Sequence, residues 1–379
     1  MYDDKYPAEC TMTNIPLAQG ITPAGREPHI TNRPGIIAPM QQRPASPTPP
    51  RLDSADVTPR HHHYGEFYGL APRWRERTPG AIRICVIGNC QAESQRILLD
   101  STGLFDSFRI PPVHEWDELD VHFARTAMAD CDVLVTQAIR DEYRGLPCGD
   151  KQLARFLPAH GTVVRYPALR YSGMNPAITI IRVPQDTSLD PPVVPYHDLH
   201  NLAAFAGVAR TGSPNFDATM QLFLHELRVR EVAHGCVEIS DVVAEAPRWH
   251  TVNHPDNATL MELARRVARR ILEVSAGSGA SGGSGTSGRS GTSGAEAALP
   301  QVHDPGRELL GGIDAPEDPQ ATAHWGVDNP RTAWVDHGAD IPVDQVWEAQ
   351  REFYRQYPDA VTEGLRRHAP MLRALGYDA

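Results

Sequence analysis

Cys90 is the residue whose surroundings most clearly predict chemistry. It follows an apolar segment at 82–87 with the composition of a buried strand and precedes a segment at 91–100 with a helical pattern. Ligands of open α/β sheets gather at the carboxyl ends of strands, and the positive end of a helix dipole stabilises a thiolate. Gly88 allows a tight turn with free backbone N–H groups, and Asn89 can donate a further N–H group. The turn can therefore supply a nucleophile and stabilise an oxyanion.

A buried structural cysteine is the alternative interpretation of Cys90, since cysteine is among the most buried residue types. The same interpretation applies to Cys85, Cys131 and Cys236, whereas Cys148 follows a proline in a predicted loop and could be merely exposed. The six cysteines include no Cys-x-x-Cys pair, so neither a disulfide framework nor a zinc ribbon is expected. We expect reduced thiols and no metal.

A nucleophilic cysteine needs a base, and two histidines are candidates. His254 lies just before a predicted long helix, where Pro255 fixes the turn and the next two residues can cap the helix. His197 lies in another loop, at 196–200, that precedes apolar sequence. Either imidazole can instead cap a helix or cover a loop, and the sequence leaves both alternatives open.

The elements that would position these residues alternate between strands and helices. Further buried strands are expected at 132–136 and 162–166, and helices follow from apolar stripes at 216–227 and 260–271. This alternation predicts an α/β domain with a mainly parallel sheet flanked by helices.

Composition divides the chain into four parts. We expect a disordered proline-rich leader at 1–80, a catalytic domain at 81–275, a Gly/Ser linker at 276–294 and an acidic helical tail at 295–379. The tail carries two predicted helices, at 343–357 and about 361–375. A small helical appendage and a segment that binds an unknown partner are equally compatible with that pattern.

The formal charge of −11 argues against general binding of nucleic acids or anionic membranes, which requires a basic surface. No apolar run is long enough for a transmembrane helix, and the N-terminus lacks the apolar core of a signal peptide. These features predict a cytoplasmic protein.

The turn at 88–91 resembles the opening signature of the WcbI family of polysaccharide-biosynthesis enzymes. Thr136-Gln137, the aromatic–Pro–Gly–Pro stretch at 166–176, and the polar segments at 196–198 and 253–257 are similar to later motifs of that family. The resemblance covers about residues 82–275. It implies a coenzyme A (CoA)-binding acyltransferase that acetylates a sugar of a capsular or surface polysaccharide, with a layout akin to SGNH-type hydrolases and Cys90 in place of their serine.

This resemblance yields a specific hypothesis. Cys90 either attacks the thioester of acetyl-CoA or lies beside its sulfur while His254 activates a saccharide hydroxyl, and Gly88 and Asn89 stabilise the oxyanion. Gln91, Asn253 and His197 are assigned to CoA binding. The phosphates of CoA would use helix N-termini or arginines, such as Arg140, Arg170 and Arg182. The alternatives are an SGNH-like esterase with water as acceptor and a non-catalytic module that binds carbohydrate or another partner.

Overall fold

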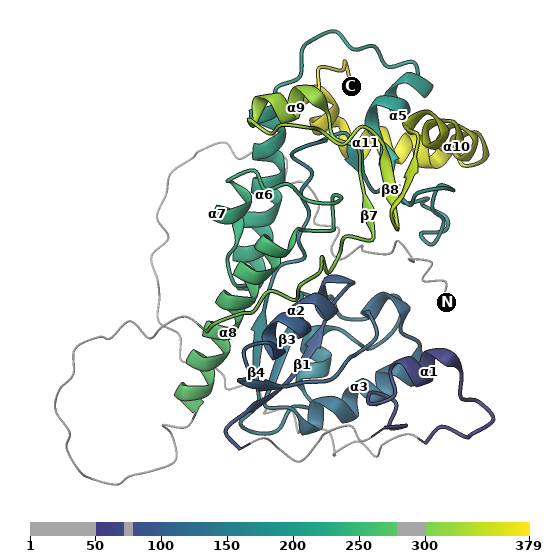
Figure 1. The fold of residues 1–379 in the computed structure, drawn as a ribbon. Coiled ribbons are helices and arrows are strands. Elements are labelled where there is room, and N and C mark those ends of the chain that lie inside the picture. Colours follow the sequence, from purple (N-terminus) through teal and green to yellow (C-terminus); the bar gives the residue numbers. More distant parts are fainter. Residues whose placement is uncertain (1–50, 72–78, 279–299) are drawn as a thin grey trace, which may run out of the picture.

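A four-stranded parallel sheet forms the centre of the protein in a computed structural model, which describes residues 51–71, 79–278 and 300–379 (Figure 1). The strand order is β2-β1-β3-β4, and all three neighbouring pairs are parallel. The strands are β1 (Ile82–Ile87), β2 (Phe105–Asp106), β3 (Val133–Thr136) and β4 (Thr162–Arg165). The predicted α/β class with a mainly parallel sheet is therefore confirmed.

The register of the sheet aligns the ends of its three longest strands. Ile87 pairs with Thr136, and Thr136 pairs with Arg165, so each of these strands ends at the same edge. The residues that follow, Gly88 and Gln137, therefore lie side by side at the carboxyl edge of the sheet. The topology thus brings together the turns that the sequence had singled out separately.

Alternating side chains of β1 supply two cores, one on each face of the sheet. Cys85 and Ile87 pack with residues of α3, whereas Ile84 and Val86 pack with residues of α2, α6 and α8. Figure 1 shows α3 and α8 on opposite sides of the sheet. The bounds are α2 (Gln91–Asp100), α3 (Glu118–Asp130), α4 (Asp150–Ala154), α6 (Phe216–His234), α7 (Ser240–Val243) and α8 (Asn257–Ser278).

Part of the expected leader packs onto the domain. Phe67 and Tyr68, which follow α1 (Pro59–His63), are buried against α3, and the Tyr68 hydroxyl donates to Asp120 Oδ1 at 2.6 Å. Arg60 of α1 forms an ion pair with the same carboxylate at 2.9 Å. The expectation of an unpacked segment is therefore wrong for residues 51–71, because these aromatic side chains complete a core. The predicted proline-rich stretch and the Gly/Ser linker beyond 278 lie outside the described residues.

The C-terminal helices pack against a segment from the middle of the chain. Tyr354 and Leu372 share a buried core with Leu199 and Leu202. These residues lie on α5 (Leu199–Phe205), α10 (Val343–Gln356) and α11 (Pro358–Ala374), which confirms the two predicted tail helices. The remaining elements are η1 (Val113–Glu115), β5 (Ile178–Thr179), β6 (His197–Asp198), β7 (Ile313–Asp314), α9 (Pro319–His324), β8 (Trp334–Asp336) and β9 (Ala339–Ile341).

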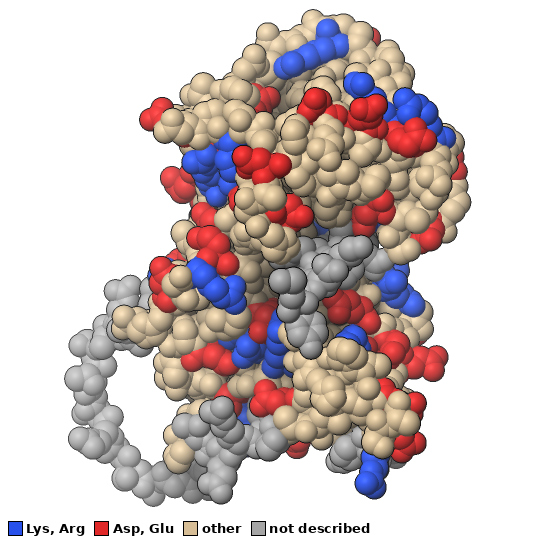
Figure 2. Space-filling model, turned by 45° about the vertical axis from the view of Figure 1, so that its right-hand side comes forward, with Lys and Arg blue, Asp and Glu red and all other residues tan. Residues whose placement is uncertain are grey.

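Acidic and basic side chains are interspersed on the face of the molecule that Figure 2 shows. In the described part of the chain, every helix is too short or too polar to cross a membrane. Cys148 is fully buried, and its thiol faces the carbonyl oxygen of Tyr143 at 3.7 Å. The expectation that Cys148 could be exposed is therefore wrong, because its loop folds inward over the core beside α3.

Candidate active site

Cys90 lies between the carboxyl end of β1 and the first turn of α2. It occupies the position before Gln91, has helical dihedral angles (φ −52°, ψ −26°) and is partly exposed, whereas both its neighbours are buried. The sequence predicts this strand–turn–helix placement, and the structure shows it. A thiol at this position feels the positive end of the α2 dipole, which favours its ionised form.

Three buried amide side chains fix the turn. Gln137 Oε1 accepts from the backbone N–H of Asn89 at 3.0 Å, and Gln137 Nε2 donates to Asn89 Oδ1 at 3.2 Å. Asn89 Oδ1 also accepts from the backbone N–H of Gln91 at 2.8 Å. These bonds orient the Asn89 side chain, whose Nδ2 group is the donor that the predicted oxyanion role requires.

Gly88 is required by close packing at the sheet edge. A Cβ atom at this position would lie 2.8 Å from Gln137 Oε1 and 2.9 Å from the hydroxyl of Tyr166. Both neighbours are fully buried and cannot move into solvent. A glycine therefore lets the strand end approach the amide side chains that hold Asn89 and Cys90.

Gln91 connects the turn to two distant segments. Its Nε2 donates to the backbone oxygens of Leu169 at 2.9 Å and Asn253 at 2.8 Å, while its Oε1 accepts from Leu169 N–H and from Gln137. All four hydrogen-bonding positions of this buried side chain are occupied by protein groups. Gln91 therefore holds the turn in place, which does not favour the predicted role of its side chain in CoA binding.

His254 is brought to the turn by this hydrogen bond. Gln91, which follows Cys90, donates to the carbonyl of Asn253, which precedes His254. The two bonded residues are 162 positions apart along the chain. The Asn253 side chain is itself held by the hydroxyl of Tyr196 at 2.9 Å. Burial lowers the pKa of His254 to about 4, so its imidazole is neutral at pH 7 and able to accept a proton.

The turn that contains His254 is anchored at both ends. Asp256 caps α8 by accepting from the backbone N–H of Thr259 at 2.9 Å, as its position in the sequence allows. On the other side, the backbone N–H of His250 donates to the His254 carbonyl at 3.0 Å. These hydrogen bonds fix the backbone of the turn that carries the His254 imidazole.

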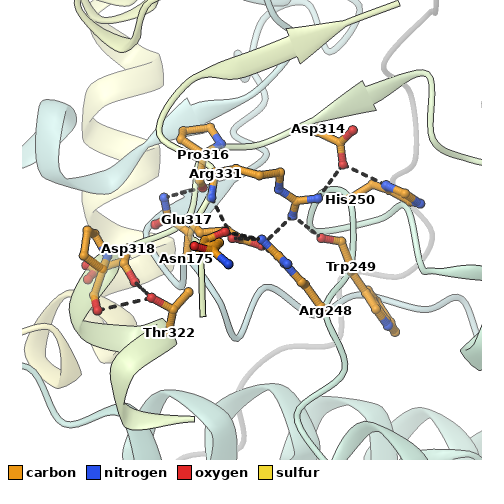
Figure 3. A network of polar contacts seen from close by, with 12 residues as sticks. Asn175, Arg248, Trp249, His250, Asp314, Pro316, Glu317, Asp318, Thr322 and Arg331 are labelled. Carbon is orange, nitrogen blue, oxygen red and sulfur yellow. Dashed lines mark hydrogen bonds and ion pairs between the residues drawn. The ribbon is translucent and has the colours of Figure 1, made fainter. Parts of the chain in front are cut away.

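A network of ion pairs supports the segment that leads into this turn (Figure 3). Glu317 accepts two hydrogen bonds from Arg248, at 2.6 and 2.7 Å, and lies 2.9 Å from Arg331 Nη2. Asp314 accepts from Arg331 at 2.5 Å and contacts His250 Nδ1 at 2.8 Å. Residues 314–331 thus hold in place the segment at 248–254, which carries His254, the candidate base.

His197 lies against α10, in the core of the C-terminal helices. It is fully buried, its Nδ1 is 3.0 Å from the hydroxyl of Tyr354, and its ring stacks on that tyrosine with centroids 5.6 Å apart. Burial lowers its pKa to about 3. This placement within the core of the C-terminal helices does not favour the predicted role in CoA binding.

His114 is a candidate that the sequence analysis missed. It lies on η1, whose Val113 N–H donates to the Gly88 carbonyl at 2.9 Å, so this turn packs directly on the cysteine turn. The imidazole is buried, its Nδ1 has no hydrogen-bond partner among the residues that the structure describes, and burial lowers its pKa to about 4. His114 follows Pro111 and Pro112 in a segment without apolar periodicity, so no local pattern in the sequence marks it.

The comparisons with known proteins agree with this architecture. A family model described as polysaccharide biosynthesis enzyme WcbI matches residues 83–273, which include β1, the cysteine turn and the turn of His254. No curated protein matches the chain. A solved structure of WcbI, described as a novel polysaccharide biosynthesis enzyme in its native form without a disulfide bond between CoA and a cysteine, has a TM-score of 0.58. The similarity covers 78% of this chain and 98% of that one at 16% identity, which establishes a shared fold. The chain belongs to the WcbI family of polysaccharide biosynthesis enzymes.

Proposed function

We propose that this WcbI-family protein transfers an acetyl group from acetyl-CoA to a hydroxyl group of a saccharide. The observation that carries the proposal is the 2.8 Å hydrogen bond between Gln91 and Asn253, because it joins the turn of a partly exposed cysteine to that of a neutral histidine. A nucleophile and a base on adjoining turns at the carboxyl edge of a parallel sheet are suited to acyl transfer.

In the first version of the reaction, the Cys90 thiolate attacks the carbonyl carbon of acetyl-CoA. The carbon–sulfur bond to CoA breaks, CoA leaves as a thiolate that takes up a proton, and the acetyl group remains on Cys90 as a thioester. The saccharide hydroxyl then gives its proton to His254 as its oxygen attacks the thioester. The products are an acetyl ester and a regenerated Cys90 thiolate.

In the second version, Cys90 forms no bond to the acetyl group. The saccharide oxygen attacks the carbonyl carbon of acetyl-CoA directly while His254 takes its proton. The carbon–sulfur bond then breaks, CoA leaves as a thiolate that takes up a proton, and Cys90 lies beside the leaving sulfur. Both versions place a negative oxygen on the acetyl carbonyl in the transition state. Backbone N–H groups at the start of α2, together with Asn89 Nδ2, are the donors suited to that charge.

The relative of known structure supports the involvement of CoA. That protein is described as its native form without a disulfide bond between CoA and a cysteine. In this chain, Cys90 is a partly exposed cysteine at the carboxyl edge of the central sheet. A CoA whose sulfur reaches this edge would present its thioester to both residues of the proposed pair.

Release of CoA from acetyl-CoA in the presence of a saccharide acceptor tests the proposal. We expect turnover to fall by at least 100-fold in Cys90→Ala and His254→Ala, in line with the contributions of nucleophiles and general bases. Cys236→Ala is the matched control, since Cys236 is also partly exposed but lies beyond β4. Unchanged turnover in both site variants would refute the assignment.

The same assay separates a transferase from an esterase. A transferase needs the saccharide for rapid CoA release and yields an acetylated sugar, whereas an esterase transfers the acyl group to water. Affinity for CoA gives a second criterion. An esterase that does not use CoA should not bind it, whereas the transferase should.

A further inference from the structure

A pocket with two arginines in its wall lies between α6, α11 and the strand β5. Its volume is about 140 Å³, and Arg170, Arg367 and His368 are among its lining residues. Much of the remaining wall is apolar and includes Phe223 and Met371. This volume resembles that of engineered cavities of about 150 Å³ that hold one benzene molecule, so the pocket fits a single ring or a short chain.

The two guanidinium groups in this pocket have no anionic partner within the described residues. Neither Arg170 nor Arg367 forms a side-chain hydrogen bond or ion pair there, and Nη2 of Arg170 is buried. A buried cationic group without a partner is costly, and native structures rarely tolerate it without a functional reason. The pocket wall therefore carries two guanidinium groups that bond to no acceptor in the described part of the chain.

The carboxylates that act on Arg367 are already paired with other arginines. Glu226 lies at the rim and bonds to Arg230 at 3.1 Å. Glu363 accepts hydrogen bonds from Nε and Nη2 of Arg366, at 2.8 and 2.7 Å. Because each carboxylate bonds to another arginine, the two together offset only part of the positive charge of the pocket.

The charges in the pocket repel one another. Burial and the nearby Arg170 lower the pKa of Arg367, and burial together with Arg367 lowers the pKa of His368 to about 3. His368 is therefore neutral at pH 7, and its Nε2 lies 3.3 Å from the Thr179 hydroxyl. An anion that entered would relieve the repulsion between the two arginines.

We propose that this pocket binds a phosphate group carried by one of the two substrates of the transferase. A phosphate monoester is a dianion near pH 7, so it balances two guanidinium groups, and arginine matches phosphate oxygens in geometry. The apolar wall accommodates the carbon atoms that carry the phosphate. The inference rests on the proposed function only for the identity of the carrier, which is either CoA or a phosphorylated sugar.

Calorimetric titration of the full chain tests this pocket without any turnover. The probes are inorganic phosphate, CoA, dephospho-CoA and glucose 1-phosphate. We expect Arg367→Gln and Arg170→Gln each to weaken binding of at least one phosphate ester by tenfold or more. Arg366→Gln is the matched control, because this neighbour is mostly exposed and paired with Glu363. It should leave binding unchanged.

The pattern among the probes identifies the carrier. If the variants weaken CoA but leave dephospho-CoA unchanged, the pocket holds the 3′-phosphate of the acyl donor. If they weaken glucose 1-phosphate but leave CoA unchanged, it holds the acceptor. If the wild type binds no phosphate probe, or if neither variant weakens any of them, the proposal is overturned.

Thermal unfolding separates ligand binding from a structural role. Without ligand, Arg367→Gln should unfold at the same temperature as the wild type or higher, since the change removes a repulsive charge. A lower unfolding temperature without any loss of phosphate binding would contradict the inference. Weakened phosphate binding in Arg367→Gln together with full turnover in Cys90→Ala would refute the proposed function and leave the pocket standing.

Discussion

A methyl group added at Gly88 should disrupt the candidate site from within. In Gly88→Ala the new Cβ atom would lie 2.8 Å from Gln137 Oε1 and 2.9 Å from the Tyr166 hydroxyl, well inside van der Waals contact. Overpacking of this kind costs about 1–3 kcal/mol. If Gln137 moves to make room, the hydrogen bond from Asn89 N–H is lost, which costs about 1–3 kcal/mol more. We expect the free energy of unfolding to fall by about 3 kcal/mol.

Urea unfolding at pH 7 measures this change. The control is Gly212→Ala, whose Cβ atom would meet its nearest neighbours at the ordinary distances of 3.7 and 3.9 Å. We expect a change within about 0.5 kcal/mol for that exposed position. If Gly88→Ala were as stable as the wild type, the packing at the sheet edge would differ from the one described, and the reason given for a glycine would be wrong.

Three further predictions concern titration, the ion-pair network and thiol reactivity. Burial lowers the pKa of His197 to about 3 and of His254 to about 4, so the unfolded chain binds protons that the folded chain excludes as the pH falls below about 6.5. Urea unfolding should therefore show a loss of about 2 kcal/mol per histidine from pH 7 to pH 5; equal stability at both values would contradict this. Glu317→Ala should cost about 2 kcal/mol because it removes the buried carboxylate that accepts hydrogen bonds from Arg248 and pairs with Arg331, both of which are partly exposed. Glu273→Ala, in an exposed pair, should cost about 0.5 kcal/mol or less; similar losses in both would refute the role of the network. Iodoacetamide at neutral pH should label Cys90 ahead of the other four described cysteines, as mass spectrometry would show; an inert Cys90 would favour a purely structural cysteine.

The sheet and its flanking helices could be predicted from the sequence because their signals are local. The strand at 82–87 and the helix at 91–100 coincide with β1 and α2, and the stripe at 260–271 lies within α8. Gly235 ends the helix that begins at Phe216 with a left-handed φ of 59°, a conformation that glycine adopts readily. Apolar periodicity and glycine placement suffice for such elements.

The parts that the sequence did not predict depend on contacts between distant segments. Tyr354 covers His197 across 157 positions, so no local pattern could place that imidazole inside a core. The hydrogen bond that joins Gln91 to Asn253 is equally invisible in the sequence, although both residues lie in segments that had been singled out. The aromatic residues near 67 follow proline-rich sequence, and only the surface of α3 gives them a core to fill.

Formation of a mixed disulfide between CoA and the protein tests the central claim most directly. The Cys90 thiolate should attack the disulfide of oxidised CoA, form a new sulfur–sulfur bond to one CoA and release the other as a thiol. Intact-mass spectrometry should then show one CoA per chain, mapped to Cys90 by peptide analysis, removed by dithiothreitol and missing in Cys90→Ser. A chain that forms no adduct, or one whose adduct lies on another cysteine, would show that the sulfur of CoA does not reach the turn between β1 and α2.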